Sequence, residues 1–274
     1  MASDLNFHET FQPEMTYIAR ILELAMDEFE GDKYHISEIA GIPTGEKKGK
    51  VEPHIKYANY MGLVDFSCNR GVYCLSTTKL GDEVWNQDRY FHEELTMWLL
   101  HYCMTRKELG APQWYYLVKK VHEGFNNEVS TSHITNMIQK DFGVSSLDAR
   151  KAVSVMKSSY SYGAFSSIQF LVWEDKLQFM EKTEDIQYQY LYAYALLNAW
   201  EKQFPEKKEI TLTEIADILC FGKIFGFNDE ELDSVLSTLA DSGVISINRQ
   251  LYPVTVIRTA SSEEMVSNMY STLI

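Results

Sequence analysis

The stretch "IPTGEKKGKVEPHIKYANYMGLVDFSCNRGVYCLS" (Ile42–Ser76) decides the fold. Its apolar residues recur at helical spacing from Val51 onward, and Pro53 fits only in the first turn of a helix, so the helix begins near Val51. Gly62 ends this helix, and two alternating strands then bracket the turn Asn69-Arg70-Gly71. The stretch therefore predicts a helix followed by a two-stranded hairpin.

The flanking sequence completes a small module. "PEMTYIARILELAMDEFEG" (13–31) predicts a helix that Gly31 ends, and "HISEIAG" (35–41) predicts a short second helix. After the hairpin, "TTKLGDEVW" (77–85) predicts another short helix. The order helix, helix, turn, helix, hairpin is typical of a winged helix, a form of helix-turn-helix protein.

The same pattern returns twice. Residues 130–165 predict a helix, a turn at Gly143 and a second helix, and residues 167–180 predict strand, turn, strand. Near the end, residues 210–257 repeat the order, with a hairpin around Asn248. Two pairs of residues there have the spacing of helix N-caps: Thr211 with Glu214, and Asn228 with Glu231.

Aromatic, strongly apolar helices lie between these units, as in "FHEELTMWLLHYCM", "PQWYYLVKKVHEGF" and "IQYQYLYAYALLNAWEKQF". Such helices are typical of a shared core. We therefore expect a mainly α protein with small β-hairpins (α+β), built of tandem winged-helix modules joined by a helical core. The expected domains are 1–90 (winged helix), 91–182 (helical and winged-helix-like) and 183–274 (winged helix).

The charge of the chain is unevenly distributed. The formal net charge is −14, which disfavours binding nucleic acid by bulk attraction. Residues 1–90 carry 9 Lys/Arg and 15 Asp/Glu, residues 91–182 carry 10 of each, and residues 183–274 carry 6 and 14. A nucleic-acid surface is therefore expected in the first or middle third, and a protein contact in the acidic last third.

The N-terminal sequence "MASDLNFHETF" has no apolar run, so it does not predict a signal peptide, and no stretch predicts a membrane span. The 4 cysteines show no metal-binding spacing. We expect a cytoplasmic protein without a metal or other cofactor.

The glycines and lysines of the opening stretch do not predict a nucleotide loop. Gly45 and Gly49 are one residue too close for a P-loop, and Val51 stands where that motif needs Ser or Thr. In a helix-turn-helix, the second helix enters the major groove. The candidate DNA contacts are then those of the turn and of the helix after it: Lys47, Lys48, Lys50, His54 and Lys56. A solvated lysine run on an ordinary turn is the alternative.

Further basic side chains fit the same interpretation. Arg70 at the hairpin tip suits a wing that reaches a minor groove, although a single exposed arginine also needs no function. In the middle third, "SLDARKAVSVMKSSY" carries Arg150, Lys151 and Lys157 and predicts a second recognition helix.

The sequence contains no recognisable catalytic motif, neither G-x-S-x-G nor H-E-x-x-H. The tightest polar trio is His8-Glu9-Thr10. Adjacent side chains diverge on regular elements, so a joint catalytic role would need an irregular backbone. The favoured interpretation is structural, with Glu9 or Thr10 capping the first helix and His8 bonded to a neighbouring module.

Several motifs together resemble the uncharacterised bacterial family DUF4007. They are "FHETF" (Phe7–Phe11), "GL" (Gly62–Leu63), "WLLH" (Trp98–His101) and "WYY" (Trp114–Tyr116). The chain departs from the family pattern with Phe7 in place of glycine, and with Glu14 and Met15 in place of an arginine and an aromatic residue.

The resemblance implies a bacterial or phage-borne protein encoded beside DNA phosphorothioation genes, whose systems mark host DNA and defend against phage. We expect a non-catalytic subunit of such a system that contacts duplex DNA through a helix-turn-helix, with partner proteins bound through the acidic last third. The alternatives are a protein-interaction adaptor built of winged helices and a DNA-nicking component with His8 and Glu9 near its centre.

Overall fold

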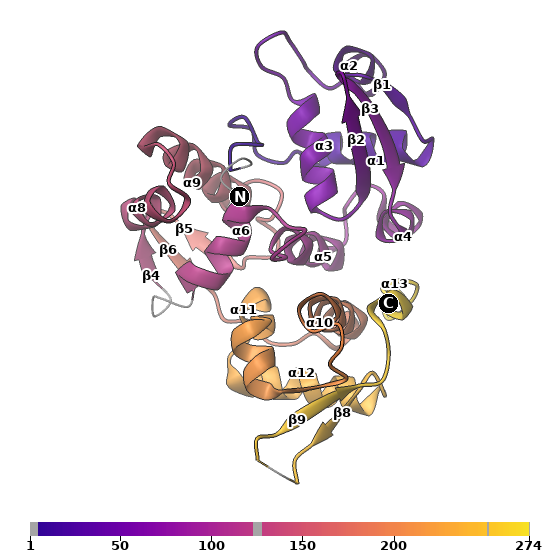
Figure 1. Ribbon diagram of the computed structural model, residues 1–274, viewed down its shortest axis with the longest axis vertical. Helices are drawn as coiled ribbons and strands as arrows, with labels where there is room; N and C mark the ends of the chain where they lie inside the picture. The colour runs from indigo at the N-terminus through magenta and orange to yellow at the C-terminus, as the bar shows by residue number, and fades with distance from the viewer. Residues whose placement is uncertain (1–4, 123–127, 251, 274) are drawn as a thin grey trace. The chain divides into compact units, whose positions relative to one another are not determined.

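The structure is a computed structural model that describes residues 5–122, 128–250 and 252–273. The chain divides into two compact units, Met1–Phe179 and Met180–Ile274. The described residues are mainly helical and carry small antiparallel sheets of three strands each, which confirms the α+β expectation (Figure 1). The division into three domains stays a prediction.

The first module opens the first unit. It comprises α1 (Met15–Met26), β1 (Glu30–Asp32), α2 (Lys33–Ala40), α3 (Val51–Tyr60), β2 (Val64–Asn69) and β3 (Val72–Thr77). Two further helices follow it, α4 (Lys79–Asp88) and α5 (Glu94–Met104). Thr78 accepts a hydrogen bond from the backbone of Gly81 and caps α4.

The first helix is shorter than the sequence predicts. It ends at Met26 rather than at Gly31, because Glu28 takes a left-handed conformation with φ of 49° and the chain turns there. Gly31 instead lies in β1, opposite Tyr73 of β3. The prediction missed this strand because three residues are too few to show an alternating pattern.

The helix pair and the hairpin of the first module are as predicted. Asp32 caps α2 by accepting bonds from the backbone of Tyr34 and His35, and α3 begins at Val51 with Pro53 in its first turn. At the hairpin tip, Arg70 and Gly71 both have positive φ, 52° and 84°, as a type I′ turn requires.

The second module completes the first unit. It comprises α6 (Pro112–Tyr116), the π-helix η2 (Leu117–Val121), β4 (Glu128–Ser130), α8 (Thr131–Phe142), α9 (Ser146–Ser161), β5 (Leu171–Trp173) and β6 (Lys176–Phe179). Gly143 ends α8 with φ of 65°, at the predicted turn. Part of the predicted helix "PQWYYLVKKVHEGF" lies outside the described residues.

The third module forms the second unit. It comprises the 3-10 helix η3 (Ile186–Tyr188), α10 (Gln189–Gln203), β7 (Glu209–Thr211), the π-helix η4 (Glu214–Ile218), α11 (Phe221–Phe225), α12 (Asp229–Asp241), β8 (Ile245–Asn248), β9 (Thr255–Arg258) and α13 (Ser262–Val266). Both predicted N-cap pairs are present. Asn228 accepts a bond from the backbone of Glu231, and Thr211 is paired with Glu214.

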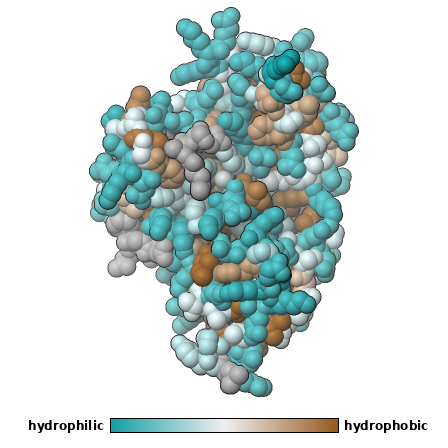
Figure 2. Space-filling model, viewed as in Figure 1, coloured by the Kyte–Doolittle hydropathy of each residue, from teal (hydrophilic) through white to brown (hydrophobic). Residues whose placement is uncertain are grey.

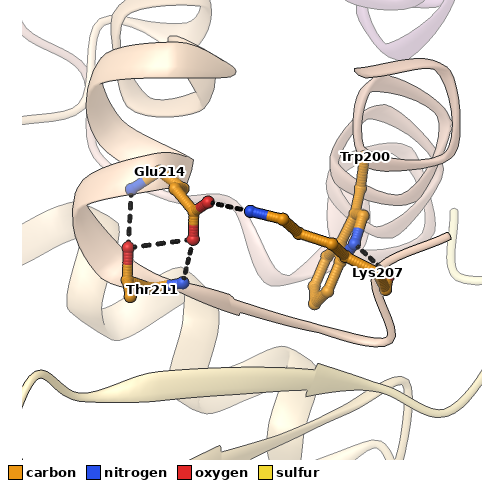
Figure 3. A network of polar contacts seen from close by, with 4 residues as sticks. All are labelled: Trp200, Lys207, Thr211 and Glu214. Atoms are coloured by element: carbon orange, nitrogen blue, oxygen red, sulfur yellow. Dashed lines mark hydrogen bonds and ion pairs between the residues drawn. The ribbon is translucent and has the colours of Figure 1, made fainter. Parts of the chain in front are cut away.

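Figure 3 shows the second of these caps inside a larger network. The backbone of Thr211 donates to Glu214, and the backbone of Glu214 donates back to the Thr211 hydroxyl. Lys207 is 2.7 Å from the same carboxylate, and its carbonyl accepts the indole N–H of Trp200. The network fixes the start of the helix to the end of α10, and it lowers the pKa of Glu214, first through Lys207 and then through the backbone of Thr211.

All three modules share one topology. In each sheet the third strand lies between the first and the second, giving the orders β1-β3-β2, β4-β6-β5 and β7-β9-β8. In each module a helix precedes the first strand, and helices separate the first strand from the second. There are two such helices in the first and second modules, and three (η4, α11 and α12) in the third. The last helix before the hairpin is α3 in the first module, α9 in the second and α12 in the third, and these three are called the second helices below.

The N-terminal segment (Leu5–Gln12) joins the first two modules. Its Phe11 carbonyl accepts a bond from the hydroxyl of Tyr57 in α3, and its Leu5 carbonyl accepts one from the side chain of Gln113 in α6. The ring of Phe7 lies 4.8 Å from that of Tyr57. The segment is therefore part of the interior of the first unit.

Helix α5 forms much of the remaining core of this unit, and all of its residues except Glu94 are buried. Its His101 contacts the hydroxyl of Tyr160 in α9 at 2.7 Å. On the face drawn in Figure 2, hydrophilic side chains cover most of the surface and the hydrophobic ones form small groups. No described helix is long and apolar enough to cross a membrane.

Candidate nucleic-acid interface

The loop before α3 presents two of the predicted lysines to solvent. Lys47 and Lys48 are exposed. The backbone of Lys50 donates to the carbonyl of Pro43 at 2.8 Å, which closes the loop at its base. In Figure 1 this loop and the tip of the β2–β3 hairpin lie at the same end of the first module.

Lys50 has a different environment. Its ammonium lies 2.7 Å from the carboxylate of Glu14 and over the rings of Phe11 and Tyr17, at 5.6 and 5.3 Å from their centroids. These contacts tie the loop to the N-terminal segment and to α1. A phosphate would have to compete with Glu14 for this lysine.

His54, predicted to contact DNA, is instead fully buried. Its Nε2 accepts a hydrogen bond from the backbone of Glu14 at 3.1 Å, so its Nδ1 carries the proton and donates to the carbonyl of Lys50 at 2.6 Å. Burial lowers the pKa of this imidazole to about 4, against smaller raising effects of the Lys50 carbonyl and Glu14. His54 is therefore a neutral structural residue at neutral pH.

The hairpin tip brings further charges to the same end of the module. Arg70 is exposed at the turn. Close by, Glu52 at the start of α3 accepts the hydroxyl of Tyr73 at 2.6 Å and lies 3.6 Å from Lys33. Burial and this carboxylate raise the pKa of Tyr73. The surface here is mixed in charge, with Glu52 partly neutralising the basic side chains.

Helix α9 of the second module has a more open basic face. Arg150 is exposed, and so are Leu147 and Ser154, which lie three and four residues from it on the same face. Lys151 is half-buried and lies 3.3 Å from Asp148. Lys157 donates to the backbone carbonyl of Glu174 in the β5–β6 turn. Of the three predicted basic residues, Arg150 is thus the most available to a ligand.

The three second helices differ sharply in exposure and charge. Every residue of α3 is buried or half-buried, and its Lys56 is half-buried and engaged in a contact. Helix α9 has 3 Lys/Arg against 1 Asp, a balance of +2, and several exposed residues. Helix α12 has 5 Asp/Glu and no Lys or Arg, a balance of −5. Only α9 combines an exposed face with positive charge.

The trio His8-Glu9-Thr10 lies in the N-terminal segment. His8 is buried, and its Nδ1 accepts the backbone N–H of Thr10 at 3.0 Å. Glu9 and Thr10 have left-handed φ values of 46° and 79°, so the backbone here is irregular. Neither caps α1, whose N-cap is Glu14 without a side-chain bond, which differs from the expectation.

Sequence reasoning named the basic residues of α9 but ranked them below the loop before α3. It missed Leu147 and Ser154, which share the exposed face of Arg150. The available signal was the spacing of 147, 150 and 154, because residues three, four and seven apart lie on one side of a helix.

These features define a mainly helical α+β protein of three repeated small modules, with a basic helix on the first unit. The chain belongs to the family described as "Protein of unknown function (DUF4007)", whose model matches residues 6–162. The expected resemblance is thereby confirmed.

Two solved structures have a similar fold. They are described as "Magnesium ion-bound SspB crystal structure" and "SspB crystal structure", with TM-scores of 0.77 and 0.76 and 14% sequence identity to each. Each alignment covers 96% of this chain and 86% of the other. Among curated proteins, no sequence matches this chain.

One of these similar structures is described as bound to a magnesium ion. Within the described ranges, no group of three or more His, Cys, Asp or Glu side chains lies together in a way that could hold a metal.

Proposed function

We propose that this chain is a DNA-binding subunit of a DNA phosphorothioation and defence system, and that it contacts duplex DNA through α9. In this proposal the three modules are winged helices, because each has a helix, a strand, two or three further helices and a hairpin in that order. The second helix of such a module is the one that enters the major groove.

The observation that carries the proposal is the contrast among the second helices. A helix that enters the major groove needs an exposed face, and it approaches a polyanion. The exposed Arg150 on a helix with a balance of +2 meets both needs. Helix α3 lacks the exposed face, and α12 lacks the positive charge because its balance is −5.

The predicted contacts of the first module have a secondary part in this proposal. Lys47 and Lys48 would contact the phosphate backbone beside the groove, and Arg70 would do so from the hairpin tip. Lys151 and Lys157 flank Arg150 on α9. His54 is left out because its imidazole is buried, and Lys50 because it is paired with Glu14.

Family membership supports the setting, since the DUF4007 resemblance implies genes beside those for DNA phosphorothioation. The acidic α12 supports a complementary role for the third module, which would contact a basic partner protein of the same system rather than DNA. This assignment follows from charge alone and leaves the partner unnamed.

The test is a DNA-binding titration with the variant Arg150→Glu. We expect the affinity for duplex DNA to fall about tenfold at low salt, because the change removes one phosphate or base contact and adds a repulsive charge. The matched control is Lys202→Glu on α10, which makes the same charge change at an exposed position of the third module. Equal losses for both variants would show a long-range charge effect, and the assignment of α9 would be wrong.

A second candidate function is nicking of DNA. It is favoured by the irregular backbone at Glu9 and Thr10, because such strained residues cluster at active sites. The test is conversion of supercoiled plasmid to the relaxed form with magnesium added, comparing the wild type with Glu9→Gln. Relaxation by the wild type alone would support catalysis at Glu9. Equal relaxation by both proteins would exclude Glu9 as the catalytic residue, and no relaxation by either would argue against nicking.

A further inference from the structure

A cavity of about 640 Å³ opens in the first unit. Its walls come from three places: the N-terminal segment with the start of α1, the start of α5, and the turn after α9. The lining residues are Gln12, Pro13, Glu14, Met15, Thr16, Phe91, His92, Glu94, Met97, Gly163, Ala164, Ser166 and Ser167. Its volume is in the range of small-molecule and nucleotide sites.

The walls are held in place by short-range hydrogen bonds. The carboxylate of Asp88 accepts from the backbone of His92 and of Glu93, at 2.8 and 3.0 Å, and so fixes the start of α5. On the opposite side, the hydroxyl of Ser166 donates to the carbonyl of Gly163 at 2.8 Å. The cavity is therefore formed by constrained backbone.

The cavity lining contains several hydrogen-bond acceptors. The side-chain oxygen Oε1 of Gln12 is buried and has no hydrogen-bond partner among the described residues. A Cβ atom at position 163 would lie 2.6 Å from this oxygen, so glycine leaves room around it. The carboxylates of Glu14 and Glu94 add further acceptors, one engaged with Lys50 and the other with the indole of Trp98 at 3.2 Å. These acceptors favour a ligand that supplies hydrogen-bond donors.

The apolar side chains of the lining suit a flat ring. Phe91 and Met97 are almost fully buried along it, with Met15 beside them, and the exposed imidazole of His92 lies at the rim. Bases bound outside a double helix are held in this way, stacked on aromatic and apolar side chains and read along the Watson–Crick edge. The two carboxylates disfavour a phosphate inside the cavity. A neutral base would therefore enter, and the sugar-phosphate backbone of its nucleotide would stay outside.

We propose that this cavity binds a guanine base. Guanine is the base whose Watson–Crick edge presents two adjacent donors, N1–H and the N2 amino group, and a carboxylate accepts such a pair with both oxygens. Adenine and cytosine present one donor beside an acceptor, and thymine places its single donor between two carbonyls. The inference rests on the proposed DNA binding, because the guanine would come from an unpaired or extruded nucleotide of the DNA. A free guanine nucleoside presents the same chemistry.

The test compares single-stranded oligothymidylates that carry one central dG, dI, dA or dT, with affinity measured by fluorescence anisotropy. Hypoxanthine in dI lacks only the N2 amino group, so we expect the dG strand to bind about tenfold more tightly than the dI strand. Glu94→Gln should remove this preference. The control Glu93→Gln makes the same change one residue away, outside the cavity lining, and should keep it.

A second measurement separates the sources and guards against a failure of DNA binding. Guanosine is titrated into the protein while the indole N–H resonance of Trp98 is followed by NMR, because this group is bonded to Glu94. A saturable shift with guanosine and not with inosine supports the cavity as a guanine site even if no DNA binds.

The outcomes are distinct for the two proposals. Equal affinity for all four strands, with binding still weakened by Arg150→Glu, would overturn the guanine site and leave the proposed function standing. A shift of Trp98 with an arginine-containing peptide and not with guanosine would also overturn it, in favour of a basic side chain of a partner protein.

Discussion

Helices α9 and α12 occupy the same place in two modules of the same topology, yet their charges are opposite. Both follow a turn, both are capped at the N-terminus by a polar side chain, and both precede a hairpin. Helix α9 has a balance of +2 and helix α12 a balance of −5. The topology therefore fixes where a recognition helix would lie, while the exposed side chains determine what it can approach.

The largest effect is expected when α9 is given a negative charge like that of α12. In the triple variant Arg150→Glu, Lys151→Glu and Lys157→Glu, we expect affinity for duplex DNA to fall about a thousandfold at low salt, at roughly tenfold for each reversed charge. The measurement is a titration over a range of salt concentrations, with circular dichroism as a check on folding. An unchanged salt slope would contradict a role for α9 in DNA binding.

A second prediction concerns the pH dependence of stability, to which histidines contribute only in the first unit. The 7 histidines all precede residue 134, and the second unit has none. Burial lowers the pKa of His54 to about 4, so the folded state binds this proton less readily than the unfolded chain does. The stability that the neutral, buried His54 contributes is fully present above the unfolded pKa of about 6.5. It is lost as the pH falls toward 4, and the loss in free energy of unfolding is at most roughly 3 kcal/mol.

Urea unfolding followed by tryptophan fluorescence at pH 7 and pH 4.5 measures this effect. In His54→Gln the loss of stability between the two pH values should be smaller than in the wild type. The control His133→Gln changes an exposed histidine of α8 and should keep the wild-type loss. A similar reduction in both variants would mean that the burial of His54 is not the cause.

The equivalent caps of the two helices should make equal contributions. Ser145 accepts the backbone N–H of Asp148 at 3.1 Å, and Asn228 accepts that of Glu231 at 3.0 Å. We expect Ser145→Ala and Asn228→Ala each to cost about 1 kcal/mol of stability in urea unfolding. Ser146→Ala, one residue beyond the cap, serves as the control. A cost for the control equal to that of Ser145→Ala would argue against capping.

The smallest effect is expected from neutralising α12. Asp229→Asn with Glu230→Gln removes two exposed acids, and we expect DNA affinity to rise about twofold at low salt and not at all at high salt, through reduced long-range repulsion. Filter binding at both salt concentrations measures the change. A rise of more than about tenfold would place DNA directly on the third module and contradict the proposed division of roles.

The sequence predicted the elements that carry strong local signals. The start of α3 at Val51, the Arg70-Gly71 turn and the caps at Thr211 and Asn228 follow from proline, glycine and hydroxyl or amide chemistry within a few residues. The first strand of each sheet was missed, because three residues show no periodicity and their pairing partners lie far along the chain.

The candidate site was harder to predict for the same reason. The burial of His54 depends on the backbone of Glu14, which is 40 residues away in the chain. The pairing of Lys50 with Glu14 is similarly distant. Local spacing assigned the charged residues to a turn and to helices, but their availability to a ligand depends on contacts made by the fold.

The N-terminal segment has a consequence for how the first two modules could act together. It is bonded to α3 on one side and to α6 on the other, so the spacing between these modules is set by interior contacts and not by a flexible tether. Two DNA-facing elements held at a fixed distance can engage one duplex only in a fixed rotational phase, which repeats about every 10.5 base pairs. Under the proposed DNA binding, the first unit would then cover a stretch of DNA of constant length.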